Sequence, residues 1–188
     1  NNRVIAFGGR VMGDGKPKYL NSPETKVFDK SRNLYGLNVA RSARKDYMLI
    51  CEGYMDVISL HQAGFNNAVA ALGTAFTSRH ASLIKRYAKE AVLTFDSDEA
   101  GIKAALRAIP YLRESGLAIK VLNMKPYKDP DEFILKYGPE RLQKYIDNAI
   151  SLVEFKIKNL KKDLNLDVAN DKIKFLTEIA KELAKVTN

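Results

Sequence analysis

Carboxylate side chains occur in three short clusters along the chain, and each cluster follows an apolar run. The clusters are CEGYMD, FDSD and KDPD, and their six acids are Glu52, Asp56, Asp96, Asp98, Asp129 and Asp131. If the apolar runs are parallel strands, their carboxyl ends meet at one edge of a sheet, where open parallel sheets bind ligands. Neighbouring carboxylates resist joint ionisation, and a divalent cation relieves that repulsion. We therefore expect these acids to bind Mg²⁺ and to act on phosphate groups.

The spacing within the first two clusters supports a shared site. Asp56 follows Glu52 by four residues, so both side chains face the same way if a helix begins near Gly53. Asp98 follows Asp96 by two residues, which allows both to reach one region from a turn. Paired metal ions at such a site activate an attacking hydroxyl group and neutralise a leaving pyrophosphate.

The third cluster is shaped by a proline. Asp129 precedes Pro130, which restricts Asp129 to an extended backbone and holds it apart from Asp131. An alternative role exists for Asp56, Asp98 and Asp131, because Asp commonly does no more than cap a helix. That alternative is strong for any single residue and weaker for three clusters that end successive strands.

Other catalytic patterns are poorly supported. His61 and His80 have no metal-ligand partner at a useful spacing. The single cysteine, Cys51, excludes a disulfide framework and a Cys-rich site, so we expect no zinc in this chain. No serine stands in a G-x-S-x-G context, and no G-x-x-x-x-G-K-S/T segment occurs, so neither a serine hydrolase nor a P-loop NTPase is indicated.

The net charge of +9 is concentrated at the start of the chain. Residues 1–45 contain ten Lys or Arg but only three Asp or Glu, and so contribute +7. A basic lobe beside a group of carboxylates suits a polyanion such as a nucleic acid, although a solvated basic surface is the alternative. No apolar stretch approaches the roughly 20 residues that span a bilayer, and no signal peptide is visible. We expect a cytoplasmic protein with no membrane partner.

Alternating strands and helices must position the acids. We expect buried-type strands at 47–52, 68–72, 91–95 and 117–123. Amphipathic helices are expected between them, at about 54–63, 78–89 and 102–112. Pro110 should kink the last of these helices or end it early. This alternation predicts a parallel sheet covered by helices.

The flanking regions have different patterns. The first 45 residues predict a small β-rich lobe, with extended pieces near 3–12 and 18–21 and a short helix at 38–45. Apolar stripes at helical spacing predict a helical tail after residue 138. We therefore divide the chain into a basic N-terminal lobe, a central α/β domain and a C-terminal helical subdomain, at 1–45, 46–138 and 139–188.

Four segments together resemble the successive motifs of a Toprim domain. They are EGYMDVI at 52–58, ALGTAFT at 71–77, FDSDEAG at 95–101 and KDPDEF at 128–133. Toprim domains occur in DnaG-type bacterial primases, in type IA and type II topoisomerases, in OLD-family nucleases and in recombination-mediator proteins. The segment at 7–37 resembles the basic region that precedes Toprim in bacterial replicative primases. The resemblance covers most of 3–138 and selects the primases among these relatives.

The resemblance implies a fold and an activity. The fold is α/β: a Toprim parallel sheet flanked by helices, with a small N-terminal β-rich basic lobe and a C-terminal helical tail. The activity is that of a DNA primase, a nucleotidyltransferase of the DNA-directed RNA polymerase type that makes short RNA primers from NTPs for DNA replication. The alternatives are a Toprim nuclease or topoisomerase fragment that cleaves a DNA backbone, and a non-catalytic nucleic-acid-binding module.

The resemblance also assigns roles to residues. It makes Glu52, Asp96 and Asp98 catalytic, and places two or more Mg²⁺ or Mn²⁺ ions on the full set of acids, Glu52, Asp56, Asp96, Asp98, Asp129 and Asp131. The residues it implies for binding template or nucleotide are Arg10, Lys18, Asn21 and Lys30.

The partners implied are a single-stranded DNA template, NTPs, the RNA primer and a replicative helicase. Primases of this family have an N-terminal zinc-binding domain and a C-terminal helicase-binding domain, and we expect both to lie outside this chain. The fragment alone should be weakly active or inactive. Its place of action would be the bacterial cytoplasm, at the nucleoid.

Overall fold

The computed structural model describes residues 3–124, 127 and 129–184. Lys128, which begins the KDPDEF segment, lies outside the described residues. The strands are β1 (Gly8–Arg10), β2 (Tyr19–Asn21), β3 (Tyr47–Cys51), β4 (Ala68–Ala70), β5 (Glu90–Thr94), β6 (Ala118–Val121) and β7 (Ile150–Ser151). The helices are the 3-10 turn η1 (Lys30–Arg32), α1 (Leu37–Ala40), α2 (Tyr54–Gln62), α3 (Ser78–Lys85), α4 (Glu99–Glu114), α5 (Pro130–Tyr137), α6 (Pro139–Asp147), α7 (Leu152–Asp163) and α8 (Ala169–Leu183).

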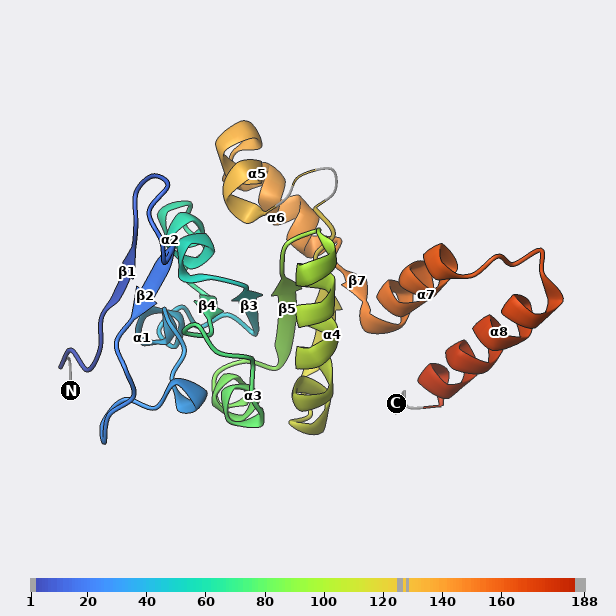
Figure 1. Ribbon diagram of the computed structural model, residues 1–188, viewed down its shortest axis with the longest axis horizontal. Helices are drawn as coiled ribbons and strands as arrows, with labels where there is room; N and C mark the ends of the chain where they lie inside the picture. The colour runs from blue at the N-terminus through green and yellow to red at the C-terminus, as the bar shows by residue number, and fades with distance from the viewer. Residues whose placement is uncertain (1–2, 125–126, 128, 185–188) are drawn as a thin grey trace.

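The central sheet confirms the predicted fold. Its strand order is β4-β3-β5-β6-β7, and the first four strands are parallel to one another (Figure 1). The chain passes from β3 outward to β4 and then returns to the other side of β3 to form β5. The direction of winding therefore reverses between β3 and β5, and such a switch point opens a crevice at the carboxyl ends of the two strands.

Alternating side chains of the strands supply two separate cores. From β3, Met48 and Ile50 pack toward α3 and α4, whereas Leu49 and Cys51 pack toward α2, α5 and α6. Both faces of β3 are therefore covered, as expected for a buried parallel strand. Figure 1 shows α2 and α5 on one side of the sheet and α3 on the other.

Two expectations about local structure were wrong. The short helix of the lobe, α1, ends at Ala40 rather than continuing to residue 45. Helix α4 does not end early at Pro110 but continues to Glu114. The proline has no N–H to donate to the carbonyl of Leu106, and both residues are exposed, so solvent can take that bond.

Two elements were not expected from the sequence. Helix α5 begins directly at Pro130, where the proline suits the first helical position. Strand β7 has two residues and pairs antiparallel with β6, which closes that edge of the sheet.

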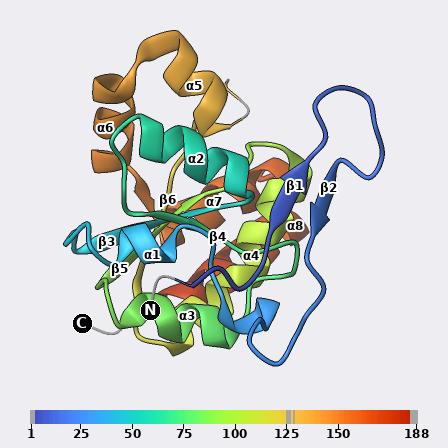
Figure 2. The same ribbon diagram turned by 90° about the vertical axis from the view of Figure 1, so that its left-hand side faces the viewer.

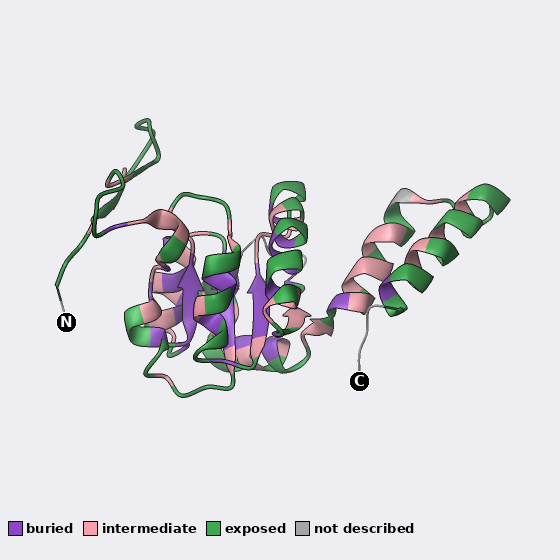
Figure 3. Cartoon of the chain, turned by 90° about the horizontal axis from the view of Figure 1, so that it is seen from below, coloured by how far each residue is buried: buried purple, intermediate pink, exposed green. Residues whose placement is uncertain are grey.

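The hairpin of the lobe and helices α7 and α8 lie beyond opposite edges of the sheet (Figure 1). Strands β1 and β2 form an antiparallel hairpin beside α2 (Figure 2). Helices α7 and α8 pack on each other beyond α4, and α8 has far fewer buried residues than the strands (Figure 3). Among the helices of the described residues, none is long and apolar enough to span a membrane.

Candidate active site

The switch point brings the ends of β3 and β5 together. Cys51 and Thr94 are register partners at the last positions of these strands, and the buried Thr94 hydroxyl donates to the Ile50 carbonyl at 3.0 Å. Glu52 follows β3 by one residue, and Asp96 follows β5 by two. The sheet therefore places both acids at one edge, although they are 44 positions apart in the sequence.

Asp56 is the acid that interacts with most of the others. It lies in the first turn of α2, and its carboxylate accepts a hydrogen bond from the Gly53 N–H at 3.0 Å. Burial raises the pKa of Asp56 to about 6, against the lowering effect of the Gly53 bond, and the charges of Asp96, Asp129 and Glu52 raise it further. Four of the six predicted acids thus interact electrostatically at the carboxyl edge of the sheet.

The remaining two acids have other contacts. Asp98 is exposed and is the N-cap of α4, where it accepts from the Gly101 N–H at 2.9 Å. Asp131 is exposed on α5 and accepts from the Ser59 hydroxyl of α2 at 2.7 Å. That bond ties the two helices together and holds α5 beside the acid-bearing end of α2.

Capping contacts are found for part of the set, and the Gly53 N–H bond of Asp56 is one of them, because Gly53 is the N-cap of α2. Asp98 caps α4, and Asp129 rather than Asp131 is the N-cap of α5, accepting from the Glu132 N–H at 2.9 Å. The backbone of Asp129 is extended, as its position before Pro130 predicted. A cap uses one carboxylate oxygen and leaves the other available.

The donor set has the chemistry of a hard divalent cation. All the acids offer oxygen ligands, and the repulsion felt by Asp56 is the kind that a cation removes. Within the described residues, no three acidic, histidine or cysteine side chains surround one point closely enough to hold a metal ion. Mg²⁺ fits such an open arrangement, because it keeps several waters and takes one or two carboxylates together with substrate phosphates.

The predicted basic residues gather partly around one tyrosine. The Arg10 guanidinium on β1 lies 5.8 Å from the ring centre of Tyr19 on β2, and the Lys18 ammonium lies 5.9 Å from it. Tyr19 in turn packs edge-on against Tyr54 of α2, with ring centres 5.2 Å apart. Two cations of the lobe therefore lie near a tyrosine ring that packs against the helix carrying Asp56.

Asn21 lies between the lobe and the central domain. A Cβ atom added at Gly73, where φ is +67°, would lie 2.6 Å from Asn21 Nδ2, and one at Gly8 would lie 3.0 Å from Asn21 Oδ1. The left-handed backbone favours glycine at position 73, and the Asn21 amide lies close to both glycines. Its Oδ1 atom is buried and accepts no hydrogen bond from the described residues.

Lys30 is held through its backbone. The Thr77 N–H donates to His80 Nδ1, so Nε2 carries the proton and donates to the Lys30 carbonyl at 2.8 Å. This buried histidine fixes η1 against α3 and leaves the half-exposed Lys30 side chain to solvent.

Comparison with known families assigns both the lobe and the sheet. Residues 49–134 match the family model described as Toprim-like, and residues 1–41 match that of the DNA primase catalytic core, N-terminal domain. A curated relative, the DNA primase of Clostridium acetobutylicum, is 49% identical over 179 residues, which are 95% of this chain and 30% of the relative.

Solved structures agree with these matches. A DNA primase domain from Pseudomonas aeruginosa superposes with a TM-score of 0.84 at 40% identity, over 98% of this chain and 59% of that one. A DnaG primase catalytic domain bound to single-stranded DNA superposes with a TM-score of 0.82 at 37% identity, over 98% and 61%. The chain belongs to the DnaG-type DNA primase family. It spans about 30% of the length of the curated relatives that it matches.

The match of the tail corrects one expectation. Residues 153–188 match the model of the DnaB-helicase binding domain of primase, whereas we expected that domain to lie wholly outside the chain. The apolar stripes of α7 and α8 predicted helices but gave no sign of this relationship. The same segment also lies within the superposition on the primase catalytic domains, since 98% of the chain is covered.

Tyr54 is the main site residue that sequence reasoning missed. Its ring is buried against Tyr19 and Tyr35, and its hydroxyl donates to the Gly9 carbonyl of β1 at 2.8 Å. This one side chain joins the basic lobe of the primase fold to the helix of the acids. Its position inside the EGYMD segment, between Glu52 and Asp56, was the available signal.

Proposed function

We propose that this chain is part of the catalytic core of a DNA primase, which synthesises short RNA primers on a DNA template by joining NTPs. One observation carries the proposal. The acids that follow β3 and β5 meet those of α2 and α5 at the switch point, and a basic hairpin packs beside them through Tyr54. The acidic edge suits a polyphosphate held through cations, and the hairpin suits a nucleic acid.

The six acids would hold two or more Mg²⁺ or Mn²⁺ ions between them, with Glu52, Asp96 and Asp98 closest to the chemistry. Bound ions supply charge neutralisation at the α-phosphate and align an RNA 3′ hydroxyl group with it. The protein's own part is to fix the acids: the Gly53 N–H holds Asp56, the Gly101 N–H holds Asp98, and the Glu132 N–H holds Asp129. Backbone donors of this kind give each carboxylate a defined orientation before substrate arrives.

The basic lobe would hold the template or the triphosphate. Arg10 and Lys18 are exposed on the hairpin, and Lys30 is presented from η1. Asn21 would position the loop after β4 rather than reach into solvent, because its amide lies against the Gly73 backbone. A DnaG catalytic domain of this fold has been solved with single-stranded DNA, which supports a DNA template for this chain as well.

The same proposal includes a division of the chain into domains and a set of partners. We propose a basic lobe at 1–45, a Toprim domain at 46–138 and a helical subdomain at 139–188. The match of residues 153–188 supports a contribution of α7 and α8 to binding a replicative helicase. Curated relatives are bacterial DNA primases, which supports a place of action at the nucleoid in the bacterial cytoplasm.

The substitution Asp96→Asn tests the role of the acids. In the intact protein it should reduce ribonucleotide incorporation on a single-stranded template by about 100-fold or more, as for loss of one preorganised electrostatic group. Template affinity, measured in parallel, should change little. Asp167→Asn, in the exposed connection between α7 and α8, is the matched control and should keep full activity. Loss of DNA nicking with primer synthesis intact would instead favour a nuclease.

The substitution Lys18→Ala tests the role of the lobe. It should weaken binding of single-stranded DNA and lower the slope of log affinity against log salt by about 0.7, the value for one phosphate contact. Lys174→Ala removes an equal charge from the exposed side of α8 and should leave the slope unchanged. Equal effects of the two substitutions would show that the lobe binds no template.

A further inference from the structure

The backbone of η1 is held from two sides by side chains that lie outside it. The Lys30 N–H donates to Glu24 Oε1 at 3.0 Å, and the Lys30 carbonyl accepts from His80 Nε2 at 2.8 Å. The next carbonyl, that of Ser31, accepts from the Thr77 hydroxyl at 2.8 Å. Three side chains, those of Glu24, Thr77 and His80, therefore form a clamp on η1. The bonds from Thr77 and His80 span 46 and 50 positions of the sequence, so only the fold brings them to η1.

His80 makes its bonds as a neutral, buried side chain. It is fully buried, and its ring packs against Phe76 with ring centres 5.4 Å apart. Nδ1 accepts from the Thr77 N–H at 3.2 Å, so the ring proton is on Nε2, from which it is donated to Lys30. Burial lowers the pKa of His80, against the raising effect of its backbone bonds and of the Asp29 charge. The uncharged imidazole thus accepts at one nitrogen and donates at the other.

An ion pair makes a weaker connection between the same two elements. Asp29 is the N-cap of η1 and accepts from the Ser31 N–H at 2.9 Å. Arg79 of α3 pairs with Asp29 at 3.3 Å. The two side chains of the pair are 62% and 39% exposed, so the pair contributes little. The place of η1 therefore depends mainly on the bonds of His80 and Thr77.

We propose that His80 is a positioning residue for template binding, because it fixes the backbone from which the Lys30 ammonium reaches a phosphate group of the DNA. The imidazole is buried and uncharged, so it acts on the nucleic acid only through Lys30. A backbone that is held before binding leaves only the side-chain torsions of Lys30 to be ordered, and such preorganisation favours affinity. The inference rests on the proposed role of the lobe in binding template and adds the residue that orients its lysine.

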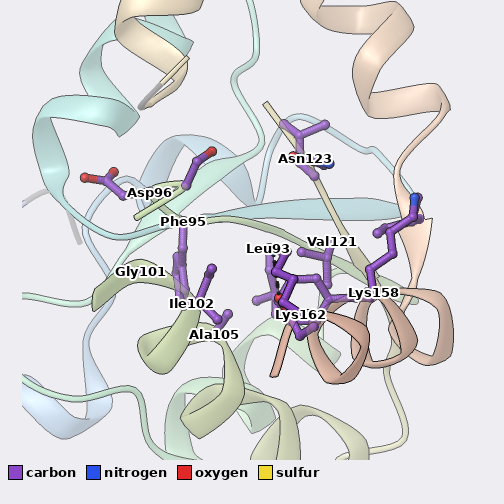
Figure 4. A pocket seen from close by; sticks show the side chains of 15 residues that line it. Leu93, Phe95, Asp96, Gly101, Ile102, Ala105, Val121, Asn123, Lys158 and Lys162 are labelled. Atoms are coloured by element: carbon purple, nitrogen blue, oxygen red, sulfur yellow. Dashed lines mark hydrogen bonds between the residues drawn. The ribbon is translucent and has the colours of Figure 1, made fainter. Parts of the chain in front are cut away.

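The clamp consists of residues other than those around the catalytic acids. Figure 4 shows Asp96 beside Phe95, at one edge of a cavity of about 260 Å³ that Gly101 and Ile102 also line. None of the three clamp residues lines this cavity. A substitution in the clamp therefore leaves the surroundings of Asp96 unchanged, and its effect on DNA binding reports on Lys30.

The test measures binding of a labelled single-stranded oligothymidine to this chain by fluorescence anisotropy, at pH 8 in EDTA and at several salt concentrations. Lys30→Ala should weaken binding by up to about fivefold and lower the slope of log affinity against log salt by about 0.7, the value for one phosphate contact. His80→Leu exchanges one uncharged side chain for another, yet it should lower the slope by a similar amount. In a chain that already carries Lys30→Ala, it should have no further effect.

A conservative variant and a matched control separate positioning from general damage to the fold. His80→Gln should restore the wild-type slope, because its amide can accept from the Thr77 N–H and donate to the Lys30 carbonyl. The control is His61→Leu, since this second histidine bonds the Ala68 carbonyl of β4 at 3.0 Å, and its replacement should leave the slope unchanged. Circular dichroism establishes that each variant folds.

Glu24 provides a second test outside the core. Glu24→Ala and Glu24→Gln lose the same charge, but only the Gln variant keeps an acceptor for the Lys30 N–H, so the Ala variant should bind the oligonucleotide less tightly. This pair decides the outcome if His80→Leu does not fold. An unchanged slope in His80→Leu, a further loss in the Lys30→Ala chain, or equal losses in the two variants at position 80 or at position 24 would each overturn the inference. If Lys30→Ala itself changes nothing, the proposed template role of Lys30 fails, and the inference fails with it.

Discussion

At the scale of single residues, the site is dominated by carboxylates that are held together before any cation binds. Asp56 is the most constrained of them, since it is partly buried, is fixed by the Gly53 N–H and has three acidic neighbours. Folding therefore raises the pKa of Asp56 and makes its ionised form less favourable. The clustering of these carboxylates lowers the stability of the fold, as is common at active sites, where charged groups are placed for function.

The raised pKa of Asp56 predicts a pH-dependent cost. Its ordinary pKa of 3.8 rises to about 6 on folding, mainly through burial, so the folded chain binds the proton more tightly than the unfolded chain does. Stability should therefore fall as pH rises from about 4 to about 6, by at most about 3 kcal/mol, and remain lower above that range. Asp56→Asn should remove the loss and stabilise the metal-free chain at pH 8, but not at pH 4.

Urea unfolding in EDTA at the two pH values measures this difference. Asp14→Asn makes the same chemical change at an exposed position of the lobe and should leave the pH dependence as in the wild type. A gain in stability for Asp56→Asn that is equal at pH 4 and pH 8 would contradict the assigned cause.

At the scale of elements, the site depends on how α5 is anchored. Asp129 and Asp131 belong to this helix, which is held against α2 and α6 by Phe133. The Phe133 ring is fully buried and packs on three tyrosines, Tyr127, Tyr137 and Tyr145. The position of the third acidic cluster thus rests on an aromatic contact from the next turn of the helix.

Removal of that contact should be costly. Phe133→Ala should destabilise the fold by about 3–5 kcal/mol, the usual cost of a large cavity in a core. Leu135→Ala lies on the same helix but is 81% exposed, so its effect should stay within about 0.5 kcal/mol. Denaturant unfolding of the two variants measures both values, and similar losses would show that α5 is not anchored through Phe133.

At the scale of the whole molecule, α8 is attached to the sheet domain through few buried side chains. Glu182 of α8 is nearly buried and pairs with Lys156 of α7 at 2.6 Å and with Arg113 of α4 at 3.1 Å. Most of the other large apolar side chains on α8, including Ile173 and Leu176, are exposed. This one carboxylate therefore connects α8 both to its neighbour helix and to the central domain.

Neutralising Glu182 should loosen the tail selectively. Glu182→Gln should speed hydrogen exchange of the α8 amides and cost about 1–3 kcal/mol, because two partly buried cations lose their partner. Exchange in β3 and β5 should not change. Lys181→Ala removes an exposed pair with Glu178 on the same helix and should cost less than about 1 kcal/mol. Faster exchange throughout the sheet in Glu182→Gln would contradict a local role.

The sequence by itself determined the alternation of strands and helices, the parallel sheet and the identity of the acidic and basic groups. These are local properties: apolar runs of strand length, helical spacing and acids at the ends of runs are all visible within a few residues. The same local view failed at Pro110 and at α5. At Pro110 the helix continues because solvent can bond the carbonyl that the proline leaves unpaired. Helix α5 forms because distant helices bury its apolar side chains.

Only the tertiary structure decided which acids meet. The order β4-β3-β5 places Glu52 beside Asp96, and no local pattern states which strands are neighbours. Likewise, α5 brings Asp129 to Asp56, and the Tyr54 bond to Gly9 brings the basic hairpin to α2. Long-range contacts of this kind are fixed by how the sheet and helices bury their apolar faces together, which is a property of the whole chain.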